Sequence, residues 1–129
     1  MKIEHLTNTN PDYPKDSILR LFDFDSSEAC LFKDVLSKLG HGTVSEIDLS
    51  EFPFVTPVHG CRLILKAGES DKGVVRLSST VFECVLRRIT WEETAGLVGL
   101  FCERKSSGYQ WLYDLDTDIE LLFSPNGNW

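Results

Sequence analysis

The chain has 129 residues, of which 42% are hydrophobic and 26% charged, and its formal net charge is −7. This length and composition are typical of one globular domain and exclude an intrinsically disordered chain. Acidic residues are spread along the whole chain, and basic residues never gather beyond adjacent pairs, which disfavours nucleic acid and membrane surfaces as partners. No segment has the apolar length of a membrane span or a signal peptide, so we expect a cytoplasmic protein.

Four cysteines, each set in an apolar segment, occur at Cys30, Cys61, Cys84 and Cys102. They form no Cys-x-x-Cys pair, and no histidine stands at the spacing of a zinc finger. Free thiols that behave as small hydrophobic residues in a reducing compartment are the simplest interpretation. The sequence therefore predicts no disulfide, no metal site and no cofactor.

The first sixteen residues are polar and contain two prolines. Such a segment is typical of a loose arm and not of a core element. We therefore expect a polar N-terminal arm at 1–16, followed by a single α+β domain at 17–129. No internal repeat or linker indicates a second domain.

A strand and a helix open the expected domain. Residues 18–24 are apolar on both faces of a two-residue period, which is typical of a central strand. Asp25 and Glu28 then form the pattern of a capping box. Apolar residues follow at helical spacing, and Gly40 predicts the end of this helix.

The middle of the chain predicts several strands. Residues 44–49 can form a short strand, and residues 61–66 alternate between apolar and charged side chains. The loop at 68–73 favours a hairpin from this strand into another at 74–77. Residues 80–89 fit either a strand or a short helix, and their β-branched and aromatic content favours the strand.

A second helix and a terminal hairpin complete the pattern. Thr90 and Glu93 predict a capping box at the start of the helix, and strands follow at 109–115 and 119–123. Two helices are too few for a parallel sheet built from strand–helix–strand units. We expect an α+β fold with a mostly antiparallel sheet of about five to seven strands and two helices packed on one face.

The segment Asp23-Phe24-Asp25-Ser26-Ser27 closes the first predicted strand. An Asp-x-Asp at the end of an apolar strand resembles the first motif of haloacid dehalogenase-like phosphatases. The resemblance implies that Asp23 is a nucleophile and Asp25 a general acid/base beside a Mg²⁺ ion. It covers five residues and departs from the family at Ser27, where Thr or Val is usual, and in the lack of a parallel sheet. The alternative is a strand end whose Asp25 caps the next helix.

Alternate aspartates at Asp114, Asp116 and Asp118 match the start of a calcium loop. The sixth and twelfth positions of that loop would be Ile119 and Pro125, where Gly and Glu are required. A turn between two strands explains these aspartates more simply, so we predict no metal site there.

Aromatic residues mark the end of the chain. Tyr109, Trp111 and Tyr113 recur at every second position and so share one face of a predicted strand. Such rings either pack under a helix or form a binding surface. Trp129 either folds back onto the same sheet or is exposed. These four residues are the candidate partner-binding residues.

The function predicted from these features is that of a non-enzymatic protein-binding or regulatory domain. The sequence contains no convergent catalytic set, and its acidic surface favours a basic protein partner, as in antitoxin or immunity proteins. The alternative is a small Mg-dependent, phosphatase-like hydrolase that uses Asp23 and Asp25.

Overall fold

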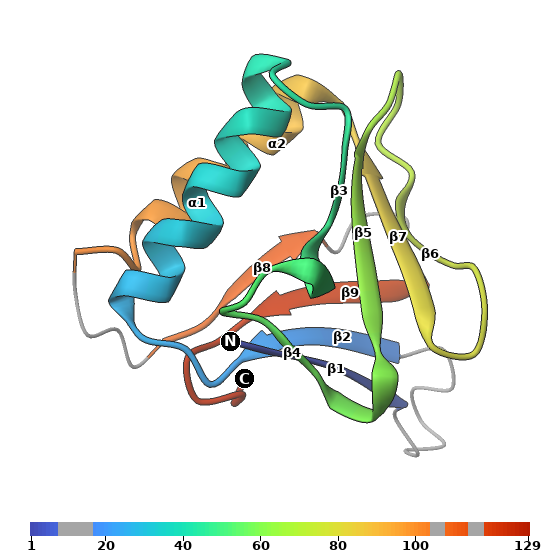
Figure 1. Cartoon of the computed structure of the whole chain (residues 1–129), viewed down its shortest axis with the longest axis vertical. Helices are drawn as coiled ribbons and strands as arrows, with labels where there is room; N and C mark the ends of the chain where they lie inside the picture. The colour runs from blue at the N-terminus through green and yellow to red at the C-terminus, as the bar shows by residue number, and fades with distance from the viewer. Residues whose placement is uncertain (8–16, 104–107, 114–117) are drawn as a thin grey trace.

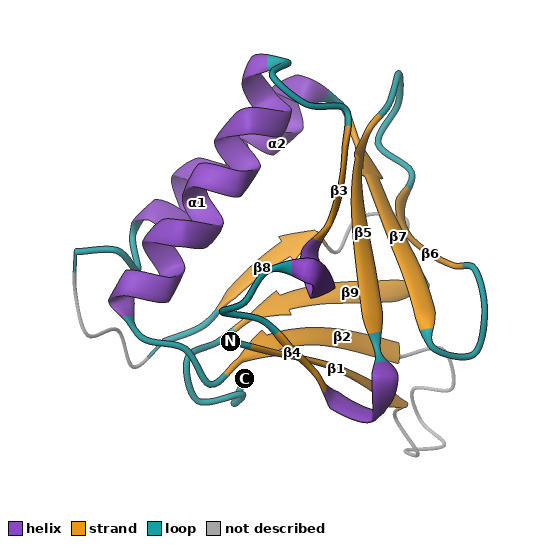
Figure 2. Cartoon of the chain, viewed as in Figure 1, coloured by secondary structure: helices purple, strands orange, loops and turns teal. Residues whose placement is uncertain are grey.

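The computed structural model describes residues 1–7, 17–103, 108–113 and 118–129. In this part of the chain, two helices and two sheets enclose one hydrophobic core (Figure 1), which confirms the predicted α+β class. The helices lie side by side on one flank, a five-stranded sheet forms the base, and a four-stranded sheet forms the other flank (Figures 1 and 2). Both sheets are mixed, so the prediction of one mostly antiparallel sheet is wrong.

The five-stranded sheet, sheet A, has the strand order β4-β1-β2-β9-β8. Its members are β1 (Lys2–Thr7), β2 (Ser17–Phe22), β4 (Thr56–Pro57), β8 (Gln110–Tyr113) and β9 (Ile119–Phe123). The β1–β2 and β8–β9 pairs are antiparallel, whereas β2 and β9 run parallel at the centre. The sheet is mixed because β2 with β9 and β1 with β4 are parallel pairs.

The four-stranded sheet, sheet B, has the strand order β3-β5-β7-β6. Its members are β3 (Glu46–Asp48), β5 (Arg62–Ala67), β6 (Gly73–Arg76) and β7 (Val81–Leu86). The strand predicted at 80–89 is confirmed for Val81–Leu86, whereas residues 88 and 89 belong to the second helix. The predicted hairpin between β5 and β6 is wrong, because β7 lies between them. Every residue of β7 from Cys84 to Leu86 is buried, and a strand buried on both faces belongs at the centre of a sheet.

The N-terminal residues form β1, so the prediction of a polar arm is wrong for this segment. Ile3 is fully buried, with β2 on one side of its strand and β4 on the other. The amino group of Met1 lies 2.6 Å from the Glu28 carboxylate. Strand β1 contributes few apolar side chains, which is why its sequence resembles that of an arm. Residues 8–16 lie outside the described part of the chain.

Helix α1 (Ser26–His41) begins at the predicted capping box. The Asp25 carboxylate accepts a hydrogen bond from the Glu28 backbone N–H at 2.9 Å, and the Glu28 carboxylate accepts one from the Asp25 N–H. The helix ends at Gly42 and not at Gly40. Gly42 adopts the left-handed conformation that stops a helix, with φ of 81°, whereas Gly40 is a buried residue within the helix.

Helix α2 (Arg88–Gly99) begins before the predicted capping box of Thr90 and Glu93, so that prediction is wrong. The Thr90 hydroxyl donates to the Asp71 carboxylate instead of capping the helix. The chain also forms two short 3₁₀ turns, η1 (Leu49–Glu51) and η2 (Val58–Gly60). Neither helix of the described residues is long and apolar enough to cross a membrane.

Candidate protein-binding surface

Asp23 and Asp25 follow β2 but make separate contacts. The Asp25 carboxylate accepts hydrogen bonds from the Ser27 hydroxyl and from the Glu28 N–H, and these bonds lower its pKa. Asp23 is solvent-exposed, and its carboxylate lies 3.0 Å from the Lys2 ammonium. Among the described residues, no group of three or more His, Cys, Asp or Glu side chains is placed to hold a metal ion. This geometry explains Asp25 as a helix cap and gives no support to a catalytic pair.

The aromatic residues predicted to share one strand face differ in their surroundings, because some are partly exposed and one is buried in the core. An irregularity in the β8–β9 register between Trp111 and Tyr113 breaks the alternation. The rings of Tyr109 and Trp111 meet edge to face, with centroids 6.2 Å apart, at a partly exposed position. Tyr113 is buried, and its hydroxyl donates to the Asp71 carbonyl at 3.2 Å. Trp129 is exposed. Of the four candidates, the structure thus brings Tyr109 and Trp111 together, and Tyr113 belongs to the core.

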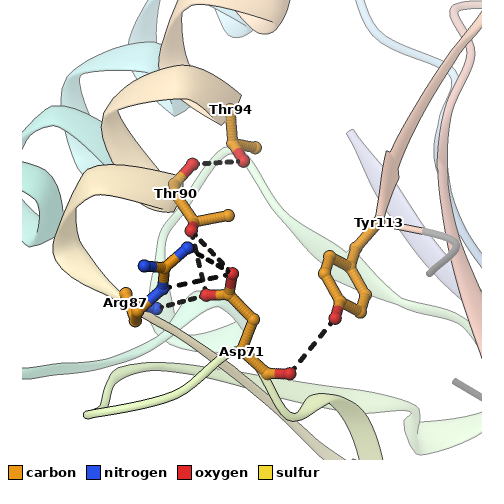
Figure 3. Close-up of polar contacts among 5 residues, drawn as sticks. All are labelled: Asp71, Arg87, Thr90, Thr94 and Tyr113. Carbon is orange, nitrogen blue, oxygen red and sulfur yellow. Dashed lines mark hydrogen bonds and ion pairs between the residues drawn. The ribbon is translucent and has the colours of Figure 1, made fainter. Parts of the chain in front are cut away.

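Asp71 links Tyr113 to the start of α2 (Figure 3). Its carboxylate accepts from the Arg87 backbone N–H at 2.8 Å and from the Thr90 hydroxyl at 2.9 Å, while the Thr94 hydroxyl donates to the Thr90 carbonyl. Burial alone would raise the pKa of Asp71, but the hydrogen bonds from Arg87 and Thr90 outweigh it and hold the pKa below its usual value. The donors and acceptors of this cluster are hydrogen-bonded to one another. The cluster therefore connects the β5–β6 loop with α2 and β8.

A small cavity of about 180 Å³ lies between β1 and the turn that joins β6 to β7. Its lining is formed by Glu4, His5, Val58, His59, Cys61, Ser79, Thr80 and Phe82. Burial and the charge of Arg76 lower the pKa of His5, so its ring is neutral at pH 7. Burial raises the pKa of Cys61 to about 11, so this thiol stays protonated and is a poor nucleophile. The cavity therefore lacks the activated thiol that a Cys–His catalytic pair requires.

A larger groove, of about 390 Å³, follows β3 and the η1 turn. We call it the β3 groove, and it is lined by Glu46, Ile47, Asp48, Glu51, Phe52 and Pro53. Half of these residues carry a carboxylate. The apolar members Ile47 and Phe52 are partly buried and pack against the core, which anchors the groove to the fold.

Asp48 fixes the shape of the β3 groove. Its carboxylate caps η1 by accepting hydrogen bonds from the Ser50 backbone N–H at 3.0 Å and from the Ser50 hydroxyl at 2.7 Å. It also forms an ion pair with Arg62 of β5. Burial alone would raise the pKa of Asp48, but the bonds from Ser50 and Arg62 outweigh it and lower the pKa. Asp48 is therefore charged at neutral pH, and the carboxylates of Glu46 and Glu51 are exposed beside it.

The open edge of sheet B runs along the β3 groove. The Ala67 N–H donates to the Ser45 carbonyl at 2.9 Å, which identifies these residues as a hydrogen-bonded pair of the β3–β5 ladder. Bonded and non-bonded pairs alternate in an antiparallel ladder. The backbone groups of Ile47 therefore point toward β5, and those of Glu46 and Asp48 point away from it, toward the edge.

The outer face of sheet B continues this surface with partly exposed aliphatic side chains. In the strand register, Ile64, Glu83 and Val75 form one row across β5, β7 and β6. Val81 and Leu77 lie in the next row, where the Leu77 N–H donates to the Val81 carbonyl. Val75 is 41% exposed and Leu77 53% exposed. Glu83 lies between Ile64 and Val75, so this face mixes apolar and charged side chains.

Comparison of the chain with protein-family models, with curated proteins and with solved structures found no match. Function is therefore inferred from the geometry of the molecule itself. None of the β3 groove residues was predicted as a site from the sequence. The available signal was the alternation of Glu46 and Asp48 with Ile47 and Leu49, which is typical of a strand with one charged and one buried face.

Proposed function

We propose that the chain is a non-enzymatic protein-binding domain whose β3 groove holds an extended, basic segment of a partner protein. The observation that carries the proposal is the position of two exposed carboxylates, Glu46 and Glu51, beside a sheet edge with outward-pointing backbone groups. An extended segment can add to such an edge through backbone hydrogen bonds. Its Lys or Arg side chains would then meet Glu46 and Glu51, because the Asp48 carboxylate is already bound by Ser50 and Arg62.

The expected affinity follows from the size of the contact. β3 has three residues, so backbone pairing is short, and an exposed ion pair contributes only about 0.2–1 kcal/mol. Apolar contact with Ile47 and Phe52 adds to these terms. The net charge of −7 speeds the encounter with a basic partner more than it strengthens the complex. We therefore expect weak, salt-sensitive binding of the kind found in transient assemblies.

A defined peptide tests the proposal without knowledge of the natural partner. The probe is a short fluorescent peptide of alternating lysine and valine, and the control peptide has glutamate in place of lysine. The chain should bind the lysine peptide, more weakly as salt increases, and should not bind the glutamate peptide. Amide shifts in the NMR spectrum should be centred on residues 45–53.

A matched pair of variants separates the β3 groove from the overall charge. Glu46→Gln with Glu51→Gln removes two groove carboxylates and should weaken binding roughly two- to thirtyfold. Glu69→Gln with Glu93→Gln removes two exposed carboxylates elsewhere and should leave the affinity within twofold. Equal weakening by both double variants, or amide shifts centred outside the groove, would reject the proposal in favour of non-specific attraction.

A further inference from the structure

Helices α1 and α2 pack in opposite directions with a defined register. A Cβ added to Gly40 of α1 would lie 2.5 Å from the Glu92 side chain, and one added to Gly99 of α2 would lie 3.3 Å from the Lys33 side chain. Lys33 stands seven residues before Gly40, and Gly99 stands seven residues after Glu92. The contacts of Gly40 with Glu92 and of Lys33 with Gly99 are thus seven residues apart on both helices. Two antiparallel helices in a constant register have this equal spacing.

The same register brings two cysteines together. Cys30 lies three residues before Lys33, and Cys102 lies three residues after Gly99. One helical turn beyond the contact of Lys33 with Gly99, the two cysteines therefore face each other. The Cys102 N–H donates to the Gly99 carbonyl at 3.1 Å, which continues the helical path beyond α2 to this residue. The Cys30 thiol also contributes to the raised pKa of Cys102, as expected for two neighbouring side chains.

This pair differs from the other two cysteines in its surroundings. Cys61 and Cys84 are buried in the core, whereas Cys30 and Cys102 are each only partly buried. A small oxidant in solvent therefore reaches the paired thiols more readily than the core thiols. Thiols on facing turns of two packed helices need only a short approach to form a bond between their sulfur atoms.

We propose that Cys30 and Cys102 are an oxidation site, at which a peroxide converts the two thiols into a reversible disulfide between α1 and the end of α2. One thiolate attacks a peroxide oxygen, which forms a sulfenic acid and releases water. The second thiol attacks the sulfenic sulfur, which forms the disulfide and releases another water. The two cysteines lose two electrons and two protons in total, and the peroxide gains them. A dithiol reductant reverses the bond by thiol–disulfide exchange.

The surroundings of Cys102 set the pace of this reaction. Burial and the neighbouring Cys30 thiol raise the pKa of Cys102 to about 11. Because the thiolate is the reactive form, little of Cys102 is reactive at pH 7. The disulfide should form slowly at neutral pH and faster as the pH rises toward 10.

Peptide mapping of the folded, full-length chain tests the assignment. The reduced protein is treated with hydrogen peroxide at neutral and alkaline pH, and its mass and cross-linked peptides are determined before and after dithiothreitol. We expect a mass lower by two hydrogen atoms, one link between Cys30 and Cys102, and full reversal by the reductant. The bond closes a long loop, so the thermal midpoint should rise by roughly 5 °C or more.

Variants provide the control. Cys102→Ser should abolish both the link and the rise in the thermal midpoint, whereas Cys61→Ala should retain both. Mapping of the wild-type chain decides the question even where a variant folds poorly. The proposal is wrong if the wild-type chain keeps four free thiols after oxidation, if other cysteines are linked, or if Cys30 and Cys102 are oxidised separately to sulfinic or sulfonic acids.

Discussion

The indole Nε1 of Trp91 donates a hydrogen bond to the main-chain carbonyl of Lys66 at 3.0 Å, and this bond ties α2 to β5. Trp91 is fully buried, so its replacement by Phe leaves the Lys66 carbonyl without this donor and opens a void. We expect Trp91→Phe to lower the free energy of unfolding by about 2–4 kcal/mol in a urea titration. Trp111→Phe is the control at a partly exposed site, and equal losses in both variants would contradict this account.

The Asp71 cluster predicts a pH-dependent stability. The pKa of Asp71 lies below its usual value of 3.8 in the folded state, so the folded chain binds this proton less tightly than the unfolded chain. The stabilisation is therefore present above pH 3.8 and is lost as the pH falls through the folded pKa. Arg87 is half exposed and its ion pair is screened, so most of the effect comes from the backbone and Thr90 hydrogen bonds.

Urea titrations across a pH range check this dependence. Asp71→Asn should lower the free energy of unfolding by about 1–2 kcal/mol at neutral pH, and its difference from the wild type should shrink as the medium becomes acidic. Asp23→Asn, at an exposed ion pair with Lys2, should change the stability by less than about 0.5 kcal/mol throughout. A difference for Asp71→Asn that grows in acid would reverse the sign and refute the assignment.

Two glycines in helices should respond differently to replacement by alanine. A Cβ at Gly96 meets none of the described atoms within 4 Å, so Gly96→Ala should gain helix propensity and stabilise the fold by about 0.5–1 kcal/mol. A Cβ at Gly40 would lie 3.1 Å from the Glu92 backbone nitrogen as well as against its side chain. Crowding of this backbone costs about 1–3 kcal/mol, so Gly40→Ala should be neutral or destabilising. Thermal midpoints of the two variants measure both signs, and a clear gain for Gly40→Ala would contradict the close helix contact.

Asp25 distinguishes the helix cap from the phosphatase-like alternative. If Asp25 serves only as the cap of α1, Asp25→Ala should lower the thermal midpoint, and Asp25→Ser should restore most of it, because serine also accepts the Glu28 N–H. The hydrolase prediction requires Mg²⁺-dependent cleavage of a phosphate monoester that Asp23→Asn abolishes. Hydrolysis that depends on both aspartates would support the hydrolase and count against the binding function.

Short sequence patterns correctly predicted the elements whose contacts join residues close together in the chain. The capping box of Asp25 and Glu28 lies within one helical turn, and it fixed the start of α1 correctly. The terminal β8–β9 pair was also predicted, because its strands are close in the chain. The predicted strand at 109–115 extends into residues 114–117, which lie outside the described part of the chain.

Features that depend on distant partners were not predicted. The insertion of β7 between β5 and β6 depends on which strand is buried on both faces, and a hairpin is the simpler interpretation of the sequence alone. The sequence pattern around Thr90 is that of a helix cap. In the structure its hydroxyl instead donates a hydrogen bond to the carboxylate of Asp71, which lies in the loop between β5 and β6. The β3 groove arises where an edge strand, η1 and Phe52 meet, so no single motif marks it. The proximity of Cys30 and Cys102 likewise follows from the packing of two helices.

The parallel contact of β2 with β9 has a consequence for synthesis on the ribosome. Ser17 pairs with Ile119, so sheet A cannot close until the residues of β9 have been made. Until then β2 presents an unpaired edge, and bringing such distant segments together carries a large loop-closure cost. Nascent chains that stall before β9 therefore expose β2 as an unpaired, aggregation-prone strand. We expect the cell's chaperones to bind them there.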